Sequence, residues 1–75
     1  MHWHLDRTAD VVIAVQDVLG RPVQTLMEDR LSPGTYSVEW NGLDASGQQA
    51  PEGAYFCVVS LNGQPFVSRK VILTR

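Results

Sequence analysis

The sequence predicts an all-β domain, an antiparallel sandwich of about seven short strands. Three observations support this prediction. Apolar and polar residues alternate with a period of two along most of the chain, which is typical of half-buried strands, and no helical stripe is present. Turn signals rich in glycine, proline and asparagine separate these segments every ~8–12 residues. The length of 75 residues allows one domain, so we expect residues 1–75 to form a single unit.

Two strands and a turn are expected in the first twenty residues. Residues 2–6 and residues 11–15 both alternate between apolar and polar side chains. Gly20 then supplies a turn, because glycine tolerates the positive φ angles that many turns need. Asp17 precedes this glycine by three residues, so its carboxylate is placed to accept hydrogen bonds from the backbone N–H groups ahead of it.

Two further strands are expected in the middle of the chain. Residues 22–26 form an extended run, and a proline suits the first position of a strand. Residues 27–31 have weak helical character, and we interpret them as a connection. Residues 32–34, Ser-Pro-Gly, have the order of a type II turn, and residues 35–40 alternate again as a strand.

The polar segment WNGLDASGQQAPEGAYF, residues 40–56, is either a site or a pair of turns. Its candidate Ca²⁺ ligands are Asn41, Asp44 and Glu52. Their spacing does not fit the calcium loop Asp-x-Asp-x-Asp-Gly with its distal Glu. Asp44-x-x-Gly47 instead repeats the spacing that begins at Asp17. Turn chemistry is therefore favoured, and no metal site is expected.

A hairpin is expected at the C-terminal end. Residues 54–61 and residues 66–74 alternate as strands, and the dipeptide Asn62-Gly63 between them is typical of a type I′ turn. The inward-facing apolar residues of all the expected strands should form the core: Trp3, Leu5, Val11, Ile13, Val15, Val23, Leu26, Tyr36, Val38, Trp40, Tyr55, Val59, Val71 and Leu73.

Neither catalysis nor cofactor binding is expected. Cys57 lies on the inward face of a strand, where it acts as a small hydrophobe, and no histidine is near it in the sequence. His2 and His4 could bind a transition metal, but Asp6 is the only further ligand nearby. No glycine loop for phosphate is present, and a sandwich of this size should have little room for a ligand cleft. We therefore expect no catalytic residue, no cofactor and no metal.

The second face of the last two strands is the expected contact surface. Four apolar residues point away from the core there: Phe56, Val58, Phe66 and Ile72. The exposed face of an antiparallel sheet is normally polar, so this apolar face indicates a contact with a neighbouring domain or with another copy of the chain. The alternatives are that this face is the inward one, or that loops cover it.

Charge and hydropathy exclude several other classes. The net charge of −2 includes no basic stripe for nucleic acid and no polybasic run for a membrane surface. No apolar run is long enough to span a bilayer, and no signal peptide is recognised. These features fit a cytosolic protein or a module of a longer exported chain. The single cysteine excludes an internal disulfide.

The order of motifs along nearly the whole chain resembles a known family. The motifs that carry the resemblance are Val15-Gln-Asp-Val-Leu-Gly-Arg-Pro-Val23, Pro33-Gly-Thr-Tyr-Ser-Val-Glu-Trp40, Asn41-Gly-Leu-Asp44, Gly53-Ala-Tyr55 and Arg69-Lys-Val-Ile-Leu73. They are similar to the immunoglobulin-like domain of the flagellar hook-assembly protein FlgD. They are also similar to the C-terminal sorting domains (type A) of type IX secretion cargo.

The resemblance implies an immunoglobulin-like, fibronectin-III-like sandwich without a catalytic role. Our first interpretation is a sorting module of an exported or cell-surface protein, part of a larger chain and recognised by the secretion translocon. Arg69 and Lys70 in the last strand match the terminal segment of sorting domains. The first alternative is a structural module of the FlgD type, used in hook assembly. The second is a free-standing sandwich that self-associates through the apolar face or an edge strand.

Overall fold

The computed structural model describes residues 1–75 and contains six strands and no helix. The strands are β1 (His2–Leu5), β2 (Ala9–Asp17), β3 (Pro22–Leu31), β4 (Gly34–Ser37), β5 (Gly53–Leu61) and β6 (Gln64–Leu73). No helix capable of crossing a membrane is present. The prediction of an all-β fold is therefore confirmed, with six strands where about seven were expected.

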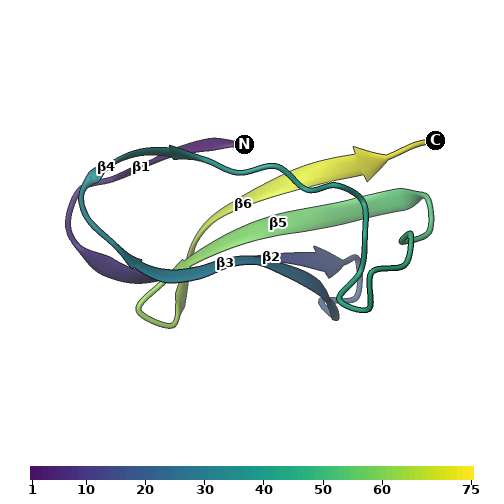
Figure 1. Cartoon of the computed structure of the whole chain (residues 1–75), viewed down its shortest axis with the longest axis horizontal. Helices are drawn as coiled ribbons and strands as arrows, with labels where there is room; N and C mark the ends of the chain where they lie inside the picture. The colour runs from purple at the N-terminus through teal and green to yellow at the C-terminus, as the bar shows by residue number, and fades with distance from the viewer.

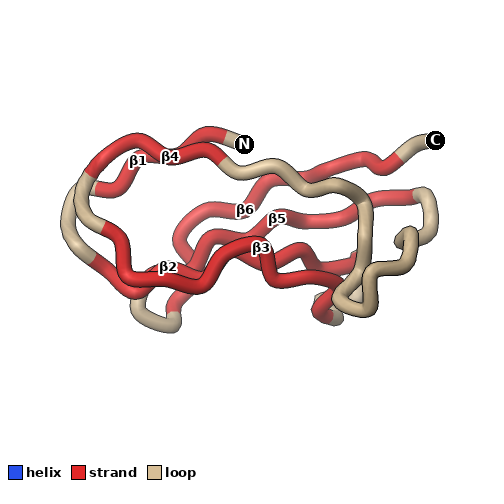
Figure 2. The backbone as a smooth tube through the Cα atoms, viewed as in Figure 1, coloured by secondary structure: helices blue, strands red, loops and turns tan.

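The strands form two antiparallel sheets that face each other (Figures 1 and 2). The larger sheet has the order β3-β2-β5-β6, so β3 and β6 are its edges. The smaller sheet pairs β1 with β4 and covers only one end of the larger sheet. At the other end, residues 38–52 cross over the sheet without regular strand pairing.

The core between the two layers has two parts. The larger part contains Trp3, Leu5, Ala9, Val11, Ile13, Cys57 and Val59. The smaller part contains Val15, Ala50 and Tyr55, near the segment that crosses the sheet. Every residue expected in the core either belongs to one of these clusters or packs against one. Fully burying one Val, Leu or Ile side chain stabilises a fold by about 1.5–3 kcal/mol, so the alternating strands carry most of the stability.

The interpretation of residues 27–31 as a connection is wrong, because β3 extends through them. Met27 pairs with the buried Ile13 and packs on the core, whereas Glu28 pairs with Val12 and is exposed. Apolar residues four apart, Met27 and Leu31, fit a helical turn and also fit the same face of a strand. A shift of register between Ile13 and Ala14 further disturbs the period of two along this strand.

Two local predictions around β4 also differ from the structure. Gly34 has a φ of 159°, an almost extended backbone, where a type II turn needs a value near 80°. The strand expected over residues 35–40 ends at Ser37. Val38 still exchanges two hydrogen bonds with Met1, each 2.9 Å long, so the chain remains beside β1 for one more residue.

The expected type I′ hairpin between β5 and β6 is confirmed. Asn62 and Gly63 have φ angles of 51° and 85°, both in the left-handed region. The turn is also tied to β2, because the side chain of Asn62 accepts a hydrogen bond from the N–H of Asp10 and its own N–H donates to the carbonyl of Asp10. This turn therefore fixes the hairpin and anchors it to the neighbouring strand.

Candidate functional site

The outer face of the larger sheet is the surface that the two layers leave uncovered. On β5 the buried residues Tyr55, Cys57 and Val59 point inward, so Phe56 and Val58 point outward. The alternative that these two residues face the core is therefore wrong. We call the surface formed by Phe56, Val58, Phe66, Ile72 and the outward residues beside them the outer face.

The most exposed apolar side chains of the outer face lie on β6. Phe66 is 52% exposed and Ile72 is 59% exposed, whereas Phe56 and Val58 are half-buried. Val58 lies between Ala14 of β2 and Ser68 of β6, and no backbone segment crosses this face. The geometry expected for a contact surface is thus present, while its use as an interface remains a prediction.

Arg69 and Lys70 do not form a common patch. Lys70 pairs with Phe56 and lies on the outer face, whereas Arg69 pairs with the buried Cys57 and lies on the inner side of β6. Both side chains are exposed because β6 is an edge strand, and neither takes part in an ion pair. A partner that contacts both charges must therefore approach the edge of β6 rather than one face of the sheet.

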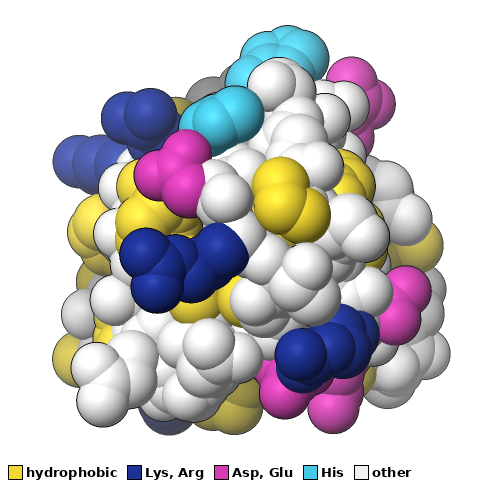
Figure 3. Space-filling model, turned by 90° about the vertical axis from the view of Figure 1, so that its left-hand side faces the viewer, with side chains coloured by type: hydrophobic (Ala, Val, Ile, Leu, Met, Phe, Trp, Pro, Cys, Tyr) yellow, Lys and Arg dark blue, Asp and Glu magenta, His cyan; other side chains and the backbone are white.

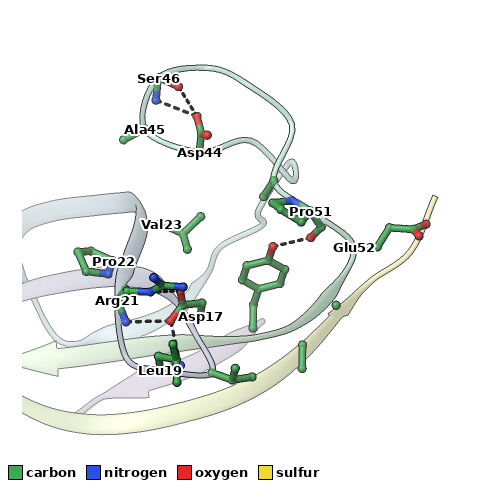
Figure 4. Close-up of a pocket in the computed structure, with 15 residues that line it drawn as sticks. Asp17, Leu19, Arg21, Pro22, Val23, Asp44, Ala45, Ser46, Pro51 and Glu52 are labelled. Atoms are coloured by element: carbon green, nitrogen blue, oxygen red, sulfur yellow. Dashed lines mark hydrogen bonds and ion pairs between the residues drawn. The ribbon is translucent and has the colours of Figure 1, made fainter.

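The structure also contains a cleft that the sequence did not indicate. It lies at the end of the sandwich where residues 38–52 cross the sheet, and its volume is about 680 Å³ (Figure 4). The expectation of little room for a ligand cleft is therefore wrong. The walls come from the turn between β2 and β3, from residues 44–46 and from residues 50–55. We call this feature the end cleft.

Two copies of one turn form opposite sides of the end cleft, with Val23 between them (Figure 4). The Asp17 carboxylate accepts hydrogen bonds from the N–H groups of Leu19 and Arg21, 2.9 and 3.0 Å long. The Asp44 carboxylate accepts equivalent bonds from the N–H groups of residues 46 and 48, also 2.9 and 3.0 Å long. In each turn the glycine three residues after the aspartate donates to the aspartate carbonyl at 3.0 Å. The interpretation of these aspartates as turn residues is therefore confirmed.

Hydrogen bonds stabilise the ionised form of both aspartates. The N–H of Arg21 is the main cause that lowers the pKa of Asp17, and the Arg21 guanidinium adds a contact of 2.8 Å. The hydroxyl of Ser46, which donates to Asp44 at 2.6 Å, is the main cause that lowers the pKa of Asp44. These carboxylates are thus engaged in holding the two turns.

The other polar groups of the end cleft are engaged in a similar way. Glu52 accepts a hydrogen bond from the N–H of Arg75, and the hydroxyl of Tyr55 donates to the carbonyl of Pro51. The lining contains neither histidine nor cysteine. One hydroxyl, that of Ser46, donates to a carboxylate, that of Asp44, and the same carboxylate oxygen accepts the N–H groups of Ser46 and Gln48 that hold the turn.

The histidines lie at the opposite end of the molecule. His4 contacts Asp6 at 3.1 Å and Thr35 at 3.4 Å, and no group of three or more His, Cys, Asp or Glu side chains is placed to hold a metal. Figure 3 views this end and shows the histidines among charged side chains of both signs, with the apolar side chains in small separate areas. Cys57 is buried in the core, and burial raises the pKa of its thiol.

The two-layer antiparallel sandwich and the paired turns define an immunoglobulin-like module. A family model described as the FlgD Ig-like domain matches residues 1–64, and the chain belongs to this family. No curated protein and no solved structure compared with the chain gave a match. The match gives no support to the type IX sorting interpretation. It ends at Gln64, so almost all of β6, including Arg69 and Lys70, lies beyond the matched residues.

Proposed function

We propose that this chain is a non-catalytic structural module of the kind used in flagellar hook assembly. The observation that carries the proposal is the match of the FlgD Ig-like domain model to residues 1–64. The end cleft supports a non-catalytic role, because its carboxylates Asp17 and Asp44 hold backbone turns. In this proposal the module works outside the cytoplasm as part of a larger exported assembly.

The module would act by binding another protein subunit of that assembly through the outer face. Phe66 and Ile72 supply exposed apolar area, and Phe56 and Val58 extend that area across β5. Burying apolar area is the main favourable term in protein association. Because the outer face lies on the side away from the core, a partner can bind there without unfolding the sandwich.

A domain exchange in a flagellated bacterium tests this proposal. The Ig-like domain of the resident hook-assembly scaffold is replaced by this chain, and hook formation and swimming are measured. We expect hooks to form, and we expect F66S/I72T to reduce their number. The matched control is V18S/L19S, because Val18 and Leu19 are 65% and 73% exposed but lie at the end cleft.

Loss of hooks in the unsubstituted chimera, with the scaffold present and folded, would contradict the structural assignment. A second assay addresses the sorting interpretation directly. The chain is fused to a reporter in a bacterium with a type IX translocon, and export is compared with that of R69A/K70A. Export of the first fusion and retention of the second would support sorting and count against our proposal.

A further inference from the structure

Both edges of the larger sheet are open to pairing. β6 pairs only with β5, and no other backbone hydrogen bond reaches residues 64–73. β3 pairs only with β2 among the strands, and away from β2 the carbonyl of Val23 accepts a hydrogen bond from the N–H of Ala45. Within residues 25–31, the N–H groups of Thr25 and Arg30 donate to the side chains of Gln24 and Asp29, and no other backbone segment pairs with this edge. Unpaired backbone groups on a strand edge are a template for another strand.

The two open edges carry opposite charges. β6 contains Arg69 and Lys70, and no acidic residue occurs from residue 61 to residue 75. β3 contains Glu28 and Asp29, whereas its arginine, Arg30, is occupied by an ion pair with Asp10 at 3.0 Å. Neither the two free cations nor the two free anions have an ion-pair partner within the chain.

The strand directions allow these edges to join. Each neighbouring pair in the order β3-β2-β5-β6 is antiparallel, so β6 runs opposite to β3. A second copy placed beside β6 in the same orientation therefore presents its β3 antiparallel to β6. The outer faces of both copies then lie on the same side of one continuous sheet.

In one register of this pairing, opposite charges lie beside each other and the paired residues lie on the same face of the joined sheet. This register places Lys70 beside Glu28 of the second copy and Arg69 beside its Asp29, and the faces match where residues 67–71 overlap with residues 27–31. Lys70 and Glu28 both lie on the outer side, since they pair with Phe56 and Val12. Arg69 and Asp29 both lie on the inner side, since they pair with Cys57 and Val11, which are buried.

The same register also matches apolar residues. It sets Val71 beside Met27 and Val67 beside Leu31, and all four side chains are half-buried and pack on the larger core cluster of their own chain. Cross-strand pairs of opposite charge and of apolar residues each favour sheet pairing. Joining β6 to itself would instead bring the like charges of Arg69 and Lys70 together.

We propose that the β6 edge of one copy pairs antiparallel with the β3 edge of a second copy, so that this chain self-associates head to tail. The proposal goes beyond the structural role inferred above. Its partner is a second copy of the chain and its contact lies along the edges of β3 and β6, whereas that role uses the outer face and rests on the family match. A head-to-tail contact leaves one open edge at each end, so association continues past the dimer.

Sedimentation equilibrium of the full chain at ~20 mM salt tests the proposal. We expect the mean mass to rise with concentration beyond that of a dimer, and to fall when the salt is raised to ~1 M, where charges are screened within about 3 Å. The variants E28K/D29K and R69E/K70E should each weaken association by about tenfold or more, as loss of two exposed ion pairs and gain of repulsion imply.

The decisive sample is an equimolar mixture of these two variants. E28K/D29K has two basic edges and R69E/K70E has two acidic edges, so the mixture should restore the association that each variant alone has weakened. The matched control is D6K/E39K, which changes the charge as much as E28K/D29K does but lies outside both open edges, and it should associate as the wild type does. Circular dichroism of each variant verifies the fold.

Three results would overturn the proposal: a monomeric wild type at every concentration in low salt, a mixture that stays monomeric, or equal loss of association in D6K/E39K. The hook assay is independent of these results. A chain that supports hooks but stays monomeric keeps the structural role and loses edge pairing. A chain that associates but supports no hooks keeps edge pairing and loses the structural role.

Discussion

The indole of Trp40 and the phenol ring of Tyr55 pack edge to face, with their centroids 4.9 Å apart and their planes at 64°. The indole N–H donates to the carbonyl of Leu43 at 2.8 Å, and the Tyr55 hydroxyl donates to the carbonyl of Pro51. The pair thus clamps both ends of the segment that crosses the sheet. This segment supplies Ala50 to the smaller core cluster, so the clamp completes the core where no second sheet is present.

The clamp predicts a graded effect of substitutions at Tyr55. Tyr55→Phe removes one hydrogen bond and should lower the free energy of unfolding by about 1 kcal/mol. Tyr55→Ala also removes a buried ring and should lower it by about 3–5 kcal/mol, which is close to the whole stability of a small domain. Urea denaturation followed by tryptophan fluorescence measures both values. Equal losses of unfolding free energy in the two variants would show that the buried ring does not contribute to stability.

The glycines of the crossing segment should differ in their response to alanine. Gly47 has a φ of 85° and open space around the position of a Cβ, so Gly47→Ala costs only backbone strain, about 1–2 kcal/mol. Gly42 has a φ of 82°, and its Cβ would approach Leu73 and Arg75 to 3.3 Å. Gly42→Ala should therefore cost more than Gly47→Ala in thermal denaturation. Gly47→Asn is the control and should cost less, since asparagine tolerates this backbone conformation.

The two aspartate turns predict a loss of stability in acid. The pKa values of Asp17 and Asp44 are lowered in the folded chain, whereas an aspartate in the unfolded chain titrates near ~3.9. As the pH falls below ~3.9 and through the folded pKa values, the unfolded state takes up protons first, so stability decreases. The double variant D17N/D44N should have a flatter dependence on pH between ~5 and ~2 in urea denaturation. The same slope in both proteins would argue against these two carboxylates as the cause.

Cys57 should be unreactive in the native protein. Its side chain is buried and its raised pKa disfavours the thiolate, which is the reactive form. Modification by a thiol reagent at pH 8 should be at least ~100-fold slower than in the urea-unfolded chain, as an opening free energy of about 3 kcal/mol gives. Similar rates in the two states would indicate that the β5 region opens readily.

Much of the fold could be predicted because it depends on a period of two and on turn chemistry. The alternation in β2 and β5 determines which residues are buried, and the Asn62-Gly63 dipeptide determines the hairpin. The exact length of β3 could not be predicted, because Met27 and Leu31 satisfy the spacing of a helix as well as that of a strand that contains a register shift. Such ambiguity is resolved only by the neighbouring strand.

The candidate sites were less predictable because they depend on pairing between distant segments. The outward direction of Phe56 and Val58 and the opposite faces of Arg69 and Lys70 follow from local alternation, but the exposure of both charges at one strand edge becomes clear only from the order of the strands. The end cleft arises because two turns from different parts of the chain lie on opposite sides of it. The repeated Asp-x-x-Gly spacing indicated each turn, but no local signal placed them at the same end of the sandwich.

The hydrogen bonding of the two aspartate turns leaves some of their positions free to change during evolution. In each turn the aspartate and the glycine make the bonds that hold the backbone, and Ser46 adds a side-chain bond to Asp44, whereas the other intervening residues contribute no side-chain hydrogen bond. Val18 and Leu19 occupy these positions in the first turn and are largely exposed. The positions of Val18, Leu19 and Ala45 can therefore accumulate substitutions at little cost to stability. These positions lie at the end cleft, so its lining can change while the hydrogen-bonded turns and the strands stay the same. New binding specificities can evolve there without a new fold.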